Sequence, residues 1–249
     1  MRRFSVLVRS LLAMQLRNRA TLFWNMAFPS GLILLYGAIW GGQRIGGVDT
    51  TAWLMVGVVV LNVMSRGLIG SATWLANLRE RSILLRVRAT PLPTTVLVGA
   101  YLLMELMLIL LESALIVAVA MLIYNAPLVW SGLGPAFGFF VLGTVVFLAL
   151  GQAIAAVAPD SRASMALGQV LYFPLMFVSN LFLPIDILPR WLAGLARWSP
   201  AYLLVDLVRP ALVGVPAMQA VGLDLGGLLI YGLLGMILAV CCFRWEPQQ

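Results

Sequence analysis

The sequence NLRERSILLRVRATPLP, at residues 77–93, separates two long apolar runs and decides how the chain is organised. It places four arginines and Glu80 within ten residues, and it ends in Thr-Pro-Leu-Pro, a pattern that stops a helix. A chain that only reverses direction needs far fewer charges. We therefore predict that residues 77–93 form a basic, helical segment that does more than connect its neighbours.

The composition around this segment is that of an integral membrane protein. Of the 249 residues, 62% are hydrophobic and only 10% are charged, and the mean hydropathy is +1.02. A soluble domain needs more polar surface, so we predict an all-α integral membrane fold in a single domain, residues 1–249. All 16 basic residues are arginines. They gather at the ends of apolar runs, where they contact lipid headgroups, and we expect no nucleic-acid partner.

The missing residue types exclude several chemistries. Without histidine or lysine the chain has no Ser-His-Asp triad, no HExxH metal site, no Schiff-base lysine and no P-loop. We therefore predict no catalytic residue, no cofactor and no metal site in this chain. The adjacent Cys241 and Cys242 suit neither a disulfide framework nor a metal site.

Six apolar runs reach the length of about 20 residues that a membrane-crossing helix needs. They are residues 20–40, 51–75, 95–124, 135–157, 165–183 and 223–243. An even number of spans puts both termini on one side. Eleven arginines then fall on that side and four on the other, which predicts cytoplasmic termini in the plasma or inner membrane.

Two segments outside these runs have patterns of their own. Residues 1–19 predict an interfacial helix with one apolar face and one arginine-bearing face, although a signal peptide is an alternative. The apolar face comprises Phe4, Leu7, Val8, Leu11, Leu12 and Met14, and the polar face comprises Arg2, Arg9, Ser10 and Arg17. Residues 184–222 predict a short helix from Pro189 to about Trp198 and a second apolar piece over 202–212. We expect an external re-entrant helical hairpin, or a lid lying on the surface.

Three features together resemble the permeases of ABC type-2 transporters. They are the basic amphipathic N-terminus, the loop RERSILLRVRATPLP, and NLFLPIDILPRWLAGLARWSPAYLLVDLVRP before the last run. The resemblance implies that residues 76–94 form a coupling helix that binds an ATPase subunit, and that the N-terminal helix also contacts this subunit. The coupling residues would be Arg79, Glu80, Arg81, Arg86, Arg88, Thr90 and Pro91. Ser82 stands where the family usually has glycine. A loop that only enforces topology is the alternative.

The resemblance also implies the partners. We expect two copies of an ABC ATPase subunit, which would bind ATP and Mg²⁺, and a second permease copy, most simply in a homodimer. The chain would export an amphiphilic substrate, such as a drug, a lipid or a lipid-linked glycan, and contact membrane lipids. Two other classes stay open, namely a self-contained proton-coupled transporter and an intramembrane enzyme.

Charged residues inside the apolar runs are candidates for the transport path. Arg66 and Glu105 lie at similar depth, roughly 14–15 Å from the cytoplasmic end of their runs, so they can pair. Glu112 lies on nearly the same helix face as Glu105 and has no obvious matched cation. Glu105 and Glu112 would line a polar path for a cationic amphiphile, or relay protons in a proton-coupled transporter, or they would be structural. Tyr172, Phe173, Met176 and Phe177 form either a hydrophobic gate or a packing face.

Overall fold

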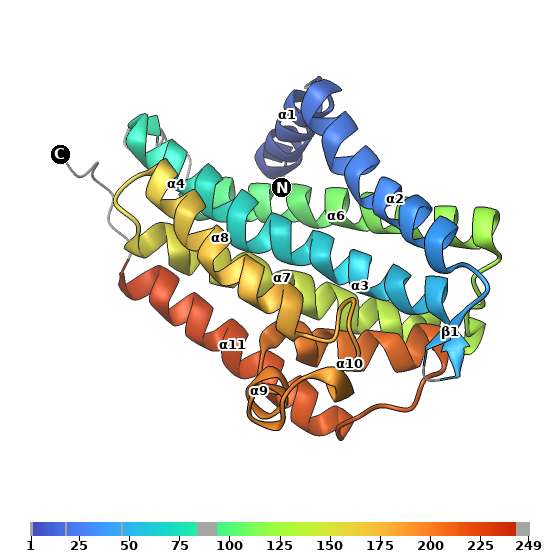
Figure 1. Cartoon of the computed structure of the whole chain (residues 1–249). Helices are drawn as coiled ribbons and strands as arrows, with labels where there is room; N and C mark the ends of the chain where they lie inside the picture. The colour runs from blue at the N-terminus through green and yellow to red at the C-terminus, as the bar shows by residue number, and fades with distance from the viewer. Residues whose placement is uncertain (1, 18, 46, 84–93, 243–249) are drawn as a thin grey trace.

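A central helix, surrounded by other long helices, organises the fold (Figure 1). The computed structural model describes residues 2–17, 19–45, 47–83 and 94–242. The central helix consists of α3 (Thr50–Met64), the π-helix η1 (Ser65–Ser71) and α4 (Ala72–Glu80). Every residue of α3 is buried. The carboxylate of Asp49 starts this helix, because it accepts hydrogen bonds from the backbone N–H groups of Thr51 and Ala52.

The other elements pack around this helix. Those before it are α1 (Arg2–Arg17), α2 (Arg19–Trp40) and the antiparallel strands β1 (Arg44–Ile45) and β2 (Val48–Asp49). Those after it are α6 (Thr94–Tyr124), η2 (Trp130–Gly132), α7 (Leu133–Val157), α8 (Ser161–Val178), η3 (Ile185–Ile187), α9 (Arg190–Ala196), α10 (Pro200–Val213) and α11 (Val221–Cys241). The end of α4 and the start of α8 lie at one end of the bundle, and the β1–β2 hairpin lies at the other (Figure 1).

Five helices of the described chain are long and apolar enough to cross a membrane. They are Phe23–Trp40, Thr50–Glu80, Val96–Tyr124, Trp130–Val157 and Val221–Cys241. The all-α membrane fold is therefore confirmed. The remaining predicted run, residues 165–183, corresponds largely to α8, which starts with polar residues and ends at Val178. The six-span arrangement remains a prediction.

Small residues let α7 and α8 pack directly on the π-helix η1. A Cβ atom built on Gly151 of α7 would lie 1.9 Å from the carbonyl oxygen of Gly67. A Cβ atom on Gly168 of α8 would lie 2.7 Å from the carbonyl oxygen of Leu68. Side chains cannot fit at such distances, so glycine at both positions sets how closely the backbones approach.

The N-terminal helix α1 is present and amphipathic. Leu11 and Leu12 pack against Tyr101 of α6 and its neighbours, while Arg9 and Arg17 are exposed. Met14 is 59% exposed and takes no part in this contact.

The two helices predicted in residues 184–222 are confirmed as α9 and α10. Ser199 caps the start of α10, and Gly214, with φ +78°, ends it. α10 is buried against α3, α7 and α11, whereas Trp191 and Trp198 are 70% and 65% exposed. The re-entrant path of this segment through the membrane remains a prediction.

Candidate functional site

A cluster of charged side chains lies inside the apolar bundle and joins the central helix to α6. Arg66 Nη1 donates to Glu105 Oε2 at 3.2 Å, and Arg66 Nε donates to Glu112 Oε2 at 3.2 Å. Arg66 Nη2 donates to the other oxygen of Glu112. Asn62 Nδ2 donates to Glu112 at 3.1 Å. One guanidinium therefore holds two buried carboxyl groups.

The expected pair of Arg66 and Glu105 is present, but the expectation that Glu112 lacks a cation is wrong. Glu105 and Glu112 are seven residues apart, so both project from the same face of α6, and the guanidinium fork spans them. Asn62 was missed by the sequence analysis. Its position four residues before Arg66, on the same helix face, is a signal that could have identified it.

Arg66 also faces a groove of about 80 Å³ between α2, the central helix and α8. Trp24 and Phe28 of α2 and Tyr172 of α8 contribute to its walls. The Arg66 side chain is 12% exposed, whereas the side chains of Glu105 and Glu112 are 3% and 1% exposed. A molecule in this groove would therefore meet the guanidinium group rather than the carboxyl groups.

The four residues proposed as a gate do not share one surface. Tyr172 lines the groove and Met176 is half-buried against the core. Phe173 and Phe177 are 51% and 59% exposed. Of the four, Tyr172 is the residue that the structure places beside Arg66.

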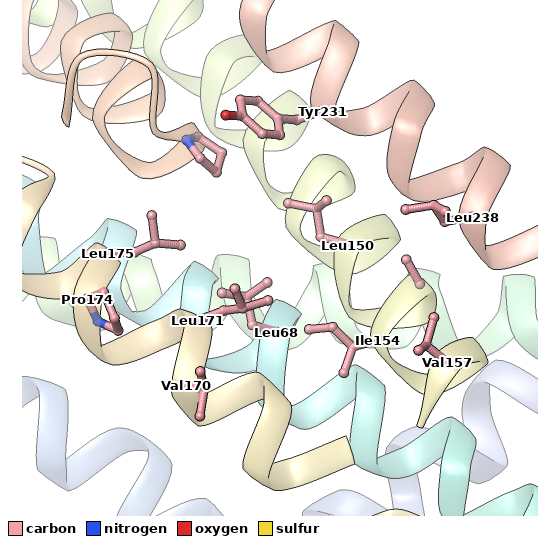
Figure 2. A pocket seen from close by; sticks show the side chains of 12 residues that line it. Leu68, Leu150, Ile154, Val157, Val170, Leu171, Pro174, Leu175, Tyr231 and Leu238 are labelled. Carbon is pink, nitrogen blue, oxygen red and sulfur yellow. The ribbon is translucent and has the colours of Figure 1, made fainter. Parts of the chain in front are cut away.

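A larger, apolar cavity of about 440 Å³ lies between α7, α8 and α11. Figure 2 shows Ile154 of α7, Leu171 of α8 and Leu238 of α11 among its lining side chains. Tyr231 also contributes to the lining, and its hydroxyl group donates to the carbonyl oxygen of Trp198 at 2.8 Å. The cavity suits hydrocarbon far better than a polar group.

Two of the predicted coupling residues, Arg79 and Glu80, bind their own chain at the end of α4. Arg79 is 2% exposed, and its guanidinium donates to the carbonyl oxygens of Ala155 at 3.0 Å and Pro159 at 3.1 Å, and also to that of Ala158. The Glu80 carboxylate accepts from the hydroxyl of Ser161 at 2.6 Å and from its backbone N–H at 3.3 Å. We call residues 158–161 the α7–α8 junction.

The remaining coupling residues follow α4. Residues 76–80, which were predicted as part of a separate loop, continue the central helix. Arg81 is exposed. Ser82 has φ +55°, in the left-handed region that favours glycine. It stands at the position where the family that the sequence resembles usually has glycine. Arg86, Arg88, Thr90 and Pro91 lie outside the described residues.

Another buried cation, Arg209, lies on α10. Arg209 of α10 donates to the carbonyl oxygens of Asn180 and Leu181 at 2.8 and 3.2 Å. Its guanidinium carbon lies 3.7 Å from the ring centroid of Trp53. Burial lowers the pKa of Arg209 to about 9, and the nearby Asp206 opposes this shift. The contacts fix α10 to the start of the central helix.

Comparisons with known proteins place the chain among transport proteins. The sequence profile of the ABC-2 type transporter family matches residues 2–213. Nodulation protein J of Rhizobium leguminosarum bv. trifolii is 28% identical over 255 residues, which cover 95% of this chain and 90% of that protein. Nodulation protein J of Rhizobium meliloti (strain 1021) is 27% identical, with the same shares covered. The putative transport permease YvfS of Bacillus subtilis (strain 168) is 23% identical over 195 residues, or 75% of this chain and 76% of that protein.

Proposed function

Because this chain belongs to the ABC-2 type transporter family, we propose that it is the membrane subunit of an ATP-driven exporter of amphiphilic molecules. Family membership across residues 2–213 is the observation that carries the proposal, and it makes the chain a multi-pass transport permease. The energy source, the direction and the class of substrate are the proposed parts.

A separate subunit would supply the energy. The chain contains no lysine and therefore no P-loop, and permeases of this family generally partner with an ABC ATPase. Two ATPase copies, carrying ATP and Mg²⁺, would bind from the cytoplasm, where we place both termini. A second copy of the permease would complete the transporter.

Two features support an amphiphilic substrate. The groove is lined by Arg66 next to Trp24 and Tyr172, and such a mixed charged and aromatic lining suits a polar head group. The cavity between α7, α8 and α11 has an apolar lining, which suits a hydrocarbon portion. The direct test is whether an ATPase subunit co-purifies with this chain and hydrolyses ATP faster in its presence.

Reversing charge on the basic segment is expected to abolish this association. A basic segment is complementary to an acidic partner surface, so Arg81→Glu combined with Arg86→Glu would place like charges together at a cost of several kcal/mol. Recovery of the ATPase should then fall by at least about tenfold. The measurement is pull-down with tagged permease from membranes that contain both subunits.

Arg44→Glu is the matched control for this double substitution. Arg44 is exposed in strand β1, at the opposite end of the bundle, so its reversal should leave recovery of the ATPase unchanged. Unchanged recovery with the double substitution would contradict docking at residues 81–93.

A further inference from the structure

Arg79 and Glu80 bind two helix ends whose partial charges are opposite to their own. The last carbonyl groups of α7 have no donors within the helix and carry partial negative charge, and the Arg79 guanidinium donates to three carbonyls at this end. The first N–H groups of α8 carry partial positive charge, and the Glu80 carboxylate accepts there from Ser161. Consecutive residues of one helix thus satisfy both sides of the α7–α8 junction.

These contacts leave little freedom between the end of α4 and the junction. Arg79 is buried although it is charged and lies at the end of the bundle. Further inside the bundle, Gly151 and Gly168 bring the α7 and α8 backbones directly onto η1. The three helices are therefore joined by backbone contact within the bundle and by charged hydrogen bonds at its end.

We propose that Arg79 and Glu80 are positioning residues that carry movement of residues 81–93 into α7 and α8. The proposal rests on the proposed function, because an ATPase subunit must supply the movement. It separates two roles that the sequence assigned to one segment. Residues from Arg81 onward contact the partner, and Arg79 and Glu80 transmit the displacement within the permease.

The consequence is that one docking segment moves α7 and α8 together with α4 and α6. Without the contacts of Arg79 and Glu80, a displacement of residues 81–93 would pass directly only into α4 and α6, which this segment connects. With them it also reaches α8, which lines both the groove beside Arg66 and the apolar cavity. Both cavities would then change shape in the same step.

The test compares movement of α8 with movement of α4 in the permease–ATPase complex in liposomes. In a Cys241→Ser, Cys242→Ser background, an environment-sensitive fluorophore is attached through Met165→Cys on α8 or, in a separate preparation, through Asn77→Cys on α4. Emission is recorded before and after trapping with ATP and vanadate. We expect Glu80→Ala and Ser161→Ala to reduce the ratio of the α8 signal to the α4 signal by about fivefold.

Two further variants distinguish transmission from a general structural role. Glu80→Gln keeps an acceptor oxygen and should retain more of the ratio than Glu80→Ala. Arg190→Gln alters an exposed arginine of α9, away from the junction, and it should leave the ratio unchanged. An unchanged ratio in both Glu80→Ala and Ser161→Ala would overturn the proposal.

Hydrogen exchange of the permease alone tests the contact without any ATPase. The Ser161 amide donates to Glu80, so it should exchange faster in Glu80→Ala than in the unaltered chain. Equal exchange would remove the structural basis of the inference. A different result is faster exchange combined with no ATP-dependent change in emission from the label at Asn77→Cys when Glu80 and Ser161 are unaltered. That result would reject the proposed function and, with it, the transmission that depends on it.

Discussion

Arg66→Met is expected to destabilise the protein by about 3–5 kcal/mol, because it leaves Glu105 and Glu112 buried without their cation. Removing one partner of a buried ion pair costs far more than the pair itself contributes. The measurement is the fraction of monodisperse protein after extraction in mild detergent, followed by thermal unfolding. Little folded Arg66→Met protein should be recovered.

Removing the two carboxylates as well should restore much of this loss. Arg66→Met combined with Glu105→Gln and Glu112→Gln contains no buried charge at this site, and it should be recovered better than Arg66→Met alone. Arg190→Met, at an exposed arginine, is the control and should behave like the unaltered chain. Full stability of Arg66→Met would show that the cluster is not structural.

Gly151→Ala is the second substitution with a large expected effect. The new Cβ atom would lie 1.9 Å from the carbonyl oxygen of Gly67 and 2.2 Å from the Ser71 hydroxyl. Because the nearer of these two atoms belongs to the backbone of η1, α7 must move away from η1. We expect a loss at the upper end of the range of about 1–3 kcal/mol for overpacked cores, measured as a fall in the unfolding temperature.

The same helix supplies the control for this prediction. Gly138 also lies in α7, and a Cβ atom there would meet nothing within 4 Å. Gly138→Ala should therefore leave the unfolding temperature unchanged or raise it, since alanine favours the helix by up to about 1 kcal/mol. Equal losses at both glycines would contradict the close approach of α7 and η1.

The sequence predicts the helices well where length and terminating residues determine them. The apolar runs locate the long helices, and Pro189, Ser199 and Gly214 locate α9 and α10. The depth of Arg66 and Glu105 also predicts their pairing. These features depend on short-range patterns or on one simple distance along a helix.

Other contacts of the site could not be predicted in this way. Arg79 binds backbone carbonyl groups 76–80 residues further along the chain, and a carbonyl group carries no sequence signal. The pairing of Glu112 with Arg66 could not be predicted, because depth alone does not say that one guanidinium can span two carboxyl groups. The continuation of α4 to Glu80 could not be predicted from hydropathy, because the apolar run ends at residue 75 and polar and charged residues follow it.

The π-helix Ser65–Ser71 gives the central helix a property that a plain α-helix lacks. Its backbone hydrogen bonds join residues five apart rather than four, while an α-helix advances about 100° per residue. A shift of this segment to α geometry would therefore change the rotation, about the helix axis, of the residues that follow Ser71. Arg66 lies within the segment and Glu80 lies beyond it, so this rotation would turn the two side chains through different angles.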